Sequence, residues 1–274
     1  MDYTLNIRGR LLSLDTPQIM GVINATPDSF YADSRAQTED EVVRYAQKMV
    51  DEGATIIDIG GFSTRPGYTD VSLPEEMKRV RAAVSSVRHA LPQVVISVDT
   101  FRPEVARMAV LEGGADIIND VGWGLKGWGE TDAYGMMDMA RRLSVPYIMM
   151  AAQPTLRDTL LFFAEYVQQM RDMGHKDIIL DPGFGFGKTL EQNYALLASL
   201  EELQVLELPL LVGISRKSMI YRQLNCKPYE ALNGTTVLNT IALMKGANIL
   251  RVHDVKEAVE CRSLVTATMM GDER

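Results

Sequence analysis

The sequence contains little histidine and cysteine. Its 274 residues include three histidines and two cysteines. The histidines occur in neither HxH nor HExxH spacing, which argues against a zinc site. Cys226 and Cys261 lie far apart and form no CxxC pair, so we interpret them as free thiols, although a bond between them stays open. This cysteine usage is typical of a reducing cytosol, and we expect a cytoplasmic protein.

Long apolar runs and an excess of basic residues are also missing. No run of ~18 apolar residues, the length of a membrane-spanning helix, occurs, and Met1–Thr4 does not open a signal peptide. The net charge of −8 argues against a nucleic-acid partner. No linker or low-complexity tract divides the chain. We therefore expect one domain over residues 1–274 with no membrane or nucleic-acid partner.

Short apolar runs alternate with helical patterns along most of the chain. The runs, which we interpret as strands buried on both faces, are Ile19–Ile23, Thr55–Ile59, Val94–Val98, Asp116–Ile118, Tyr147–Met150, Asp177–Leu180, Leu210–Gly213 and Ile249–Val252. The helical segments are Thr38–Glu52, Pro74–Ala90, Pro103–Glu112, Thr131–Leu143, Thr155–Met173, Thr189–Leu200, Pro228–Lys245 and Val255–Met270.

Strands and helices that alternate in this way predict an α/β fold. A chain of this length fits a (β/α)8 TIM barrel, in which eight strand–helix units form a single domain. An open, doubly wound sheet is the second interpretation. The segment Tyr3–Leu14 alternates weakly around Gly9 and predicts a short N-terminal hairpin.

Polar residues stand at or just after the ends of the predicted strands, the edge where barrel active sites lie. Any one of them is more often a cap or turn residue, so the inference depends on the set. Asp99, Asn119 and Asp181, with Lys217, suit a flat, nitrogen-rich heterocycle held by paired hydrogen bonds. A second group suits an anion such as a diphosphate: Asn24, Ser63, Thr64, Arg65, Arg251 and His253. The amide oxygen of Asn24 is also a suitable Mg2+ ligand.

The glycine-rich stretch Ile178–Thr189 raises a separate question. Its sequence GFGFGKT resembles a phosphate-binding loop, but three residues rather than four separate Gly183 from Gly187. We therefore attribute the function of the stretch to Asp181, and expect Lys188 at the surface of the following helix.

Four segments resemble the dihydropteroate synthase family: GVINATPDSF at Gly21–Phe30, GGFSTRPG at Gly60–Gly67, ILDPGFGFG within Ile178–Gly187 and GISRKS at Gly213–Ser218. Four shorter motifs agree in order and spacing: SVDT at Ser97–Thr100, IIND at Ile117–Asp120, NGTT at Asn233–Thr236 and RVHD at Arg251–Asp254. The resemblance runs from Ile19 to the last helix.

This resemblance implies a homodimeric barrel that joins 6-hydroxymethyl-7,8-dihydropterin diphosphate to 4-aminobenzoate, with Mg2+, and that is a sulfonamide target. By motif, the pterin would contact Asp99, Asn119, Asp181, Lys217 and Met149. The diphosphate would contact Asn24, Thr64, Arg251 and His253, with Asn24 also on the metal. The aminobenzoate would contact Phe30, Arg65, Pro66 and Ser218. Lys217, Asp99 and Arg251 would be the catalytic residues.

The sequence departs from the family pattern at three places. Phe62 replaces an acid, Met150 replaces a common histidine, and Asp33 is shifted by one residue in the first loop. Two alternatives therefore stay open: a methyltetrahydrofolate-type methyltransferase of the same barrel group, and an inactive pterin-binding paralogue.

Overall fold

The computed structural model describes residues 3–25, 35–62, 71–122 and 133–271. Eight parallel strands in these ranges form one sheet in the order β8-β7-β6-β5-β4-β3-β10-β9. They are β3 (Gln18–Asn24), β4 (Ile56–Gly60), β5 (Val95–Thr100), β6 (Ile117–Asp120), β7 (Tyr147–Met150), β8 (Ile178–Asp181), β9 (Leu211–Val212) and β10 (Ile249–Val252). A parallel bridge between Leu180 and Leu210 joins the two outer strands. The sheet is therefore a nearly closed barrel, as predicted, and the open-sheet alternative is wrong.

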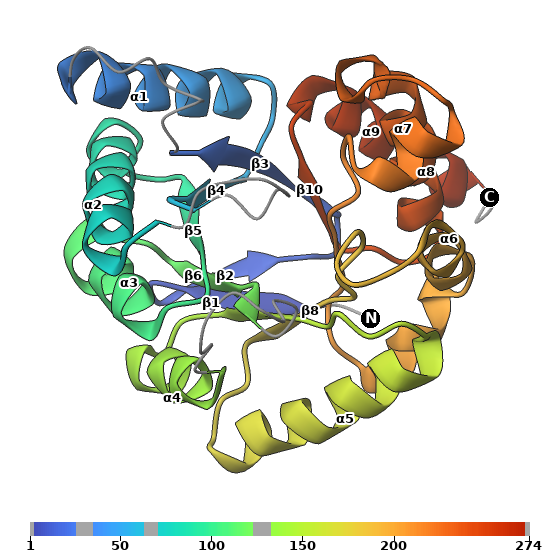
Figure 1. The fold of residues 1–274 in the computed structure, drawn as a ribbon, viewed down its shortest axis with the longest axis horizontal. Coiled ribbons are helices and arrows are strands. Elements are labelled where there is room, and N and C mark those ends of the chain that lie inside the picture. The colour runs from blue at the N-terminus through green and yellow to red at the C-terminus, as the bar shows by residue number, and fades with distance from the viewer. Residues whose placement is uncertain (1–2, 26–34, 63–70, 123–132, 272–274) are drawn as a thin grey trace.

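Helices surround the strands as an outer ring (Figure 1). The α-helices are α1 (Arg35–Asp51), α2 (Leu73–Ala90), α3 (Pro103–Met108), α4 (Ala133–Leu143), α5 (Leu156–Asp172), α6 (Leu190–Ala198), α7 (Ser218–Gln223), α8 (Leu232–Met244) and α9 (Val255–Gly271). A π-helical turn at Ala109–Gly113 extends α3, and 3-10 turns occupy Leu200–Leu206 and Pro228–Glu230. The short helix α7 has no counterpart among the predicted helices. No helix in the described part of the chain has both the length and the apolar character to cross a membrane.

Three helices end beside a Gly-Ala pair that precedes a strand: Gly53-Ala54, Gly114-Ala115 and Gly246-Ala247. Gly53, Gly114 and Gly246 have φ angles of 103°, 86° and 90°. This left-handed conformation costs glycine little because it has no Cβ. Each glycine ends a helix, and the chain enters the next strand within a few residues.

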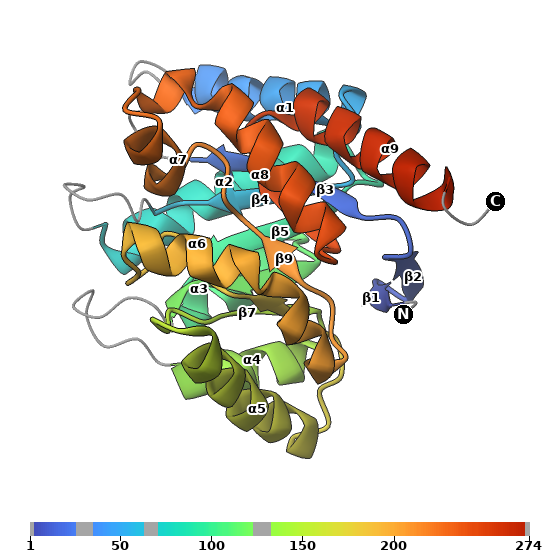
Figure 2. The same cartoon turned by 90° about the vertical axis from the view of Figure 1, so that its right-hand side faces the viewer.

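The N-terminal hairpin consists of β1 (Thr4–Ile7) and β2 (Arg10–Ser13), which pair antiparallel. Its two turn residues, Arg8 and Gly9, have φ angles of 51° and 78°. This combination is typical of the tight turns that match the twist of a hairpin. Figure 2 shows the hairpin at the end of the barrel opposite α7. We call the hairpin end the floor and the end formed by the carboxyl ends of the strands the mouth.

Side chains inside the barrel form an apolar layer at the floor. Leu5, Ile7 and Leu14 of the hairpin region pack in one cluster with one buried residue from each barrel strand. The strand residues are Met20, Ile56, Val95, Ile117, Ile148, Ile179, Leu211 and Ile249. Their immediate neighbours along the strands, such as Ile57 and Ile118, instead join the cluster that includes the helices. This alternation is the two-residue period of a strand, and it determines which side chains face the ligand side.

Candidate active site at the mouth of the barrel

The strand period places a polar layer directly above the apolar layer of the floor. On five of the eight strands, the residue two positions beyond the apolar member, on the same face of the strand, is polar: Asp58, Ser97, Asn119, Asp181 and Arg251. The first four have relative exposures of 0–7%. Such buried polar groups are costly unless they are paired. The sequence therefore builds a polar site on an apolar base.

Arg251 connects Asp58 of this layer with Asp99, which lies two residues beyond Ser97 on β5. Its Nε donates to Asp58 Oδ2 at 2.7 Å, and its Nη2 donates to Asp99 Oδ2 at 2.5 Å. The amide of Asn119 donates to the same Asp58 oxygen at 3.2 Å. Predicted residues from β5, β6 and β10 are thus brought together, around a residue of β4 that the sequence interpretation missed. Asp58 was missed because that interpretation considered strand ends, whereas Asp58 lies in mid-strand within the apolar run IIDIG.

Asp181 and Lys217 lie against the glycine-rich loop that follows β8. Asp181 Oδ1 accepts a hydrogen bond from the backbone N–H of Gly183 at 2.8 Å. The ammonium of Lys217 donates to the carbonyl of Phe184 and lies 4.6 Å from the ring centroid of Phe186. The loop therefore holds the carboxylate through an N–H and the lysine through a carbonyl.

The glycines of this loop are required by its shape. Gly183, Gly185 and Gly187 have φ angles of 67°, 81° and 61°. A Cβ added at Gly183 would lie 2.2 Å from the carbonyl oxygen of Ala151, and one at Gly185 would lie 3.0 Å from Cδ of Lys217. Because any side chain at Gly183 would overlap the main chain after β7, this turn admits only glycine.

The expectation that Lys188 is a surface residue is wrong. Its side chain is partly buried, and its ammonium donates to the carbonyls of Ala151, Gly183 and Phe186 at 3.2, 3.0 and 3.4 Å. Burial lowers the pKa of Lys188 to about 8. Lys188 therefore fixes the glycine-rich loop to the end of β7, a role that its place just before the helix cap Thr189 did not reveal.

The turn after β9 is fixed to the turn after β10. Arg216, with φ 54°, forms two hydrogen bonds of 2.8 Å with the two carboxylate oxygens of Asp254. Ser215 Oγ lies 3.1 Å from His253 Nδ1 and accepts the backbone N–H of His253 at 3.2 Å. These contacts set the positions of Lys217 and of Ser218, the first residue of α7. The short helix α7 thus belongs to the mouth.

Burial governs the charges of this site. It raises the pKa of Asp99 to about 7, against the opposing effect of Arg251, and it raises the pKa of Asp181 against the effect of Lys217. Burial lowers the pKa of Lys217 to about 8, although Asp181 opposes this change. Burial also acts to lower the pKa of Arg251, but Asp58 and Asp99 overcome it and the pKa is raised. Burial therefore disfavours the charged forms of Asp99, Asp181 and Lys217 in the protein.

The remaining predicted residues include two at the mouth, one that faces the helices, and several outside the described ranges. Asn24 ends β3 at the mouth and is partly buried, and His253 follows β10. Met149 is corrected: it packs with Tyr147 in the layer between barrel and helices, because it alternates with the inward-facing Ile148. Several predicted residues lie outside the described ranges: Phe30, Asp33, Ser63, Thr64, Arg65 and Pro66.

Comparison with known proteins gives consistent matches over nearly the whole chain. The family model described as "Pterin binding enzyme" matches residues 20–253. The dihydropteroate synthase of Escherichia coli is 41% identical, with 97% of this chain and 96% of that protein covered. The structure of Xanthomonas albilineans dihydropteroate synthase with 4-aminobenzoic acid has a TM-score of 0.89 at 35% identity, covering 98% of this chain and 99% of that one. The Yersinia pestis enzyme with a sulfonamide drug has a TM-score of 0.87 at 39% identity, covering 98% and 100%.

This chain belongs to the dihydropteroate synthase family. Two of its departures from the usual dihydropteroate synthase sequence come together in space. Phe62 and Met150 are both buried in one small apolar cluster with Phe101 and Val121. The rings of Phe62 and Phe101 meet edge to face at a centroid distance of 5.2 Å. The two positions at which the sequence departs from the expected family pattern therefore lie in a single apolar patch at the mouth.

A buried ion pair supports this patch from α2. The guanidinium of Arg102 lies 4.8 Å from the ring centroid of Phe101 and 5.8 Å from that of Phe62. Its Nη1 donates to Glu76 at 2.6 Å, and Glu76 also accepts the hydroxyl of Thr100 at 2.7 Å. The chain next to Asp99 is thus held by both aromatic and ionic contacts.

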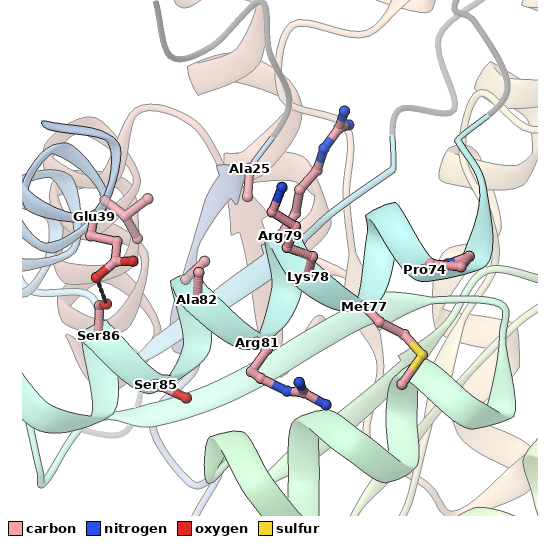
Figure 3. Close-up of a pocket in the computed structure, with 12 residues that line it drawn as sticks. Ala25, Glu39, Pro74, Met77, Lys78, Arg79, Arg81, Ala82, Ser85 and Ser86 are labelled. Atoms are coloured by element: carbon pink, nitrogen blue, oxygen red, sulfur yellow. Dashed lines mark hydrogen bonds between the residues drawn. The ribbon is translucent and has the colours of Figure 1, made fainter. Parts of the chain in front are cut away.

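A separate hollow of about 780 Å3 lies on the outer wall of the barrel, beside α2 (Figure 3). Met77, Arg79 and Arg81 are among the α2 residues that line it, and Glu39 of α1 accepts a hydrogen bond from Ser86 beside it. Among the described residues, none of those predicted for the site lines this hollow, and Ala25, which follows Asn24, lines it at its mouth side. We therefore identify the candidate active site with the polar mouth.

Proposed function

We propose that this chain joins 6-hydroxymethyl-7,8-dihydropterin diphosphate to 4-aminobenzoate, giving 7,8-dihydropteroate and diphosphate. The observation that carries the proposal is the polar layer at the mouth, where Arg251 bridges Asp58 and Asp99 next to Asn119. Membership of the dihydropteroate synthase family supports the same reaction.

In this proposal the polar layer binds the pterin ring. The carboxylates of Asp99 and Asp181 and the amide oxygen of Asn119 are hydrogen-bond acceptors, and they suit the N–H groups of a pterin. Lys217 is a cation beside them and suits the ring carbonyl. Met150 belongs to the apolar patch formed with Phe62, Phe101 and Val121. We therefore propose Met150, in place of Met149, as the apolar neighbour of the ring.

We assign the diphosphate to Asn24, Arg251 and His253, together with Thr64. Mg2+ binds proteins through one or two oxygen ligands and completes its shell with waters and substrate phosphates. The partly buried amide of Asn24 at the end of β3 fits this pattern, so we propose Asn24 as the protein ligand. When bound, the ion would neutralise charge on the departing diphosphate.

The aminobenzoate would lie at the outer edge of the mouth. We assign its contacts to Ser218, which begins α7, and to Phe30, Arg65 and Pro66. The C–O bond between the pterin methylene and the diphosphate breaks, the C–N bond to the arylamine forms, and the amine releases one proton to solvent or diphosphate. The carboxylates of Asp99 and Asp181 would stabilise positive charge that develops on the pterin. Lys217, Asp99 and Arg251 are accordingly the proposed catalytic residues.

One assay tests this function directly. Purified protein is incubated with pterin diphosphate, 4-aminobenzoate and Mg2+, and dihydropteroate is measured by chromatography. We expect product formation that requires both substrates and that an aryl sulfonamide inhibits competitively with 4-aminobenzoate. Absence of product would refute the synthase assignment, and methyl transfer from methyltetrahydrofolate would support the methyltransferase alternative.

We further propose that the protein is a cytoplasmic homodimer. Val237 and Met244 of α8 and Leu264 of α9 have relative exposures of 49%, 64% and 71%. The neighbouring helices α8 and α9 thus carry exposed apolar side chains, which suits a subunit interface. Light scattering should give the mass of a dimer for the wild type, and Leu264→Lys should shift the mass towards the monomer. Both described cysteines are free thiols, which supports the cytoplasmic location.

A further inference from the structure

Asp58 is less accessible than Asp99 and Arg251, with which it forms one ion-pair group. Its side chain has 0% relative exposure, whereas those of Asp99 and Arg251 each have 19%. A ligand entering the mouth can therefore reach the Arg251–Asp99 pair, while Asp58 lies beneath it. This position suits a residue that holds other side chains in place.

A single oxygen of Asp58 serves two side chains of the site. Oδ2 accepts Arg251 Nε at 2.7 Å and Asn119 Nδ2 at 3.2 Å. The ionised carboxylate has only acceptors, so Asn119 must present its NH2 group to it and not its carbonyl oxygen. Asp58 thereby sets which way the Asn119 amide points.

The opposite end of the Asn119 amide is left for a ligand. Asn119 Oδ1 is buried and has no hydrogen-bond partner among the residues that the structure describes. A buried acceptor without a partner costs about 1–3 kcal/mol, and a ligand N–H would remove this cost. Together with Asp99 and Asp181, Asn119 then presents three acceptors and selects a donor-rich edge of the ring.

We infer that Asp58 is a positioning residue that makes the site select a 2-amino pterin over its 2-oxo counterpart by fixing the orientation of Asn119. This inference rests on the proposed function for the choice of ring. Without the Asp58 carboxylate, the Asn119 amide can turn over and present NH2 to the ligand. The NH2 group would then donate to a ring carbonyl, so the site would bind a 2-oxo ring as readily as a 2-amino ring.

The test compares the dissociation constants of pterin and lumazine, which carry an amino group and an oxo group at position 2. Both are measured by calorimetry without turnover. We expect the wild type to bind pterin at least about 30-fold more tightly, since a site built to pair with a hydrogen-bonding group discriminates strongly against an analogue lacking it. Asp58→Asn should reduce this ratio at least tenfold. An unchanged ratio in a folded Asp58→Asn variant would overturn the inference.

Two further variants separate positioning from loss of fold. Asp58→Glu keeps the negative charge beside Arg251 but displaces the oxygens by one methylene, so the ratio should again fall. In an Asn119→Ala background, Asp58→Asn should leave the ratio unchanged, because Asp58 acts through Asn119. A further fall in this double variant would overturn the inference.

Asp116→Asn is the matched control. Asp116 is also fully buried and also pairs with arginine, through Arg8 and Arg88, but at the floor. It should lower the midpoint of thermal unfolding and leave the pterin-to-lumazine ratio unchanged. If Asp116→Asn changed the ratio as much as Asp58→Asn, the effect of Asp58 would be structural and the inference would fall.

The outcomes also distinguish this inference from the proposed function. A wild type that selects pterin but makes no dihydropteroate would refute the synthase reaction while leaving the role of Asp58 to be decided by the variants. A wild type that makes dihydropteroate and shows no preference for pterin over lumazine would overturn the inference alone.

Discussion

The two ends of the barrel use buried aspartates in opposite ways. At the floor, each oxygen of Asp116 has its own arginine: Arg8 Nε lies 2.7 Å from Oδ1 and Arg88 Nη2 lies 2.6 Å from Oδ2. The backbone N–H of Ile96 also donates to Oδ2, at 2.9 Å, whereas the contact of Oδ1 with Arg8 is an ion pair without a hydrogen bond. At the mouth, Asp58 and Asp99 share Arg251, and Asp58 Oδ1 has no partner among the described residues.

This difference indicates that the floor aspartate stabilises the fold, whereas the mouth aspartates are arranged for ligand binding. At the floor, both oxygens of Asp116 contact arginines of the same chain, so the charge of Asp116 is neutralised without a ligand. The mouth leaves buried acceptors that a ligand can satisfy, at the expense of stability in the free protein. We therefore expect substitutions at the floor to lower the free energy of unfolding without changing ligand affinity, and substitutions at the mouth to lower ligand affinity without lowering the free energy of unfolding.

The largest effect should come from the floor. Asp116→Ala leaves Arg8 and Arg88 without their shared carboxylate, and breaking a buried ion pair in this way costs about 3–5 kcal/mol. Urea unfolding should show this loss of stability. The KM values for both substrates should stay unchanged at a temperature where the variant is folded. A large change in KM would show that the floor also affects ligand binding, against the proposed difference between the two ends.

At the mouth, Asp181→Ala should lower pterin affinity without lowering stability. Loss of a charge-assisted hydrogen bond to the ligand is worth about 1.5–3 kcal/mol, so pterin affinity should fall by about 10- to 150-fold. The urea midpoint should stay equal to or above that of the wild type, because a buried carboxylate with a raised pKa is removed. Calorimetry with pterin gives the affinity, and retained binding would remove Asp181 from the site.

The charge of Asp99 should make the free protein less stable at neutral pH. Burial raises the pKa of Asp99 to about 7, from ~3.9 in an unfolded chain. Between these values the native state binds more protons than the unfolded state, so the free energy of unfolding falls as pH rises through the window and is constant outside it.

Urea unfolding of the ligand-free protein at several pH values checks this sign. We expect Asp99 to contribute a decrease of about 3 kcal/mol between pH 4 and pH 7. Asp99→Asn should give a shallower slope, with the remainder due in part to Asp181, whose pKa is also raised. An identical slope in wild type and variant would show that Asp99 is not destabilised by burial.

The smallest effect should come from the apolar patch at the mouth. Phe62→Leu removes the edge-to-face contact with Phe101 and the stacking of Arg102, and an aromatic pair contributes about 1 kcal/mol. Thermal unfolding should show this small loss with unchanged pterin affinity. A marked loss of pterin affinity would instead show that Phe62 contributes to the ligand site.

Much of the fold was readable from periodicity. The strands are buried on both faces and appear as unbroken apolar runs, and the Gly-Ala pairs at Gly53, Gly114 and Gly246 mark helix ends because left-handed φ angles favour glycine. The short helix α7 was missed, since its six residues SMIYRQ are too few to show a helical period.

The candidate site was predictable only at the strand ends. Asp99, Asn119 and Asp181 could be found because carboxyl ends of parallel strands converge at one edge of a barrel. Asp58 could have been found from the same two-residue period, since it shares a strand face with Gly60. Met149 was assigned to the ligand side in place of Met150 because an unbroken apolar strand gives no sign of which face is inward.

The sequence by itself determined the barrel, because the order of apolar runs and glycine stops depends on local backbone preferences and burial. It also determined the chemical kinds of the mouth residues. Only the tertiary structure decided their partners: Asp58 with Arg251 across 193 residues of chain, and Lys188 with Ala151 across 37. Such pairings arise from barrel closure and strand register, which bring together side chains that no local pattern relates.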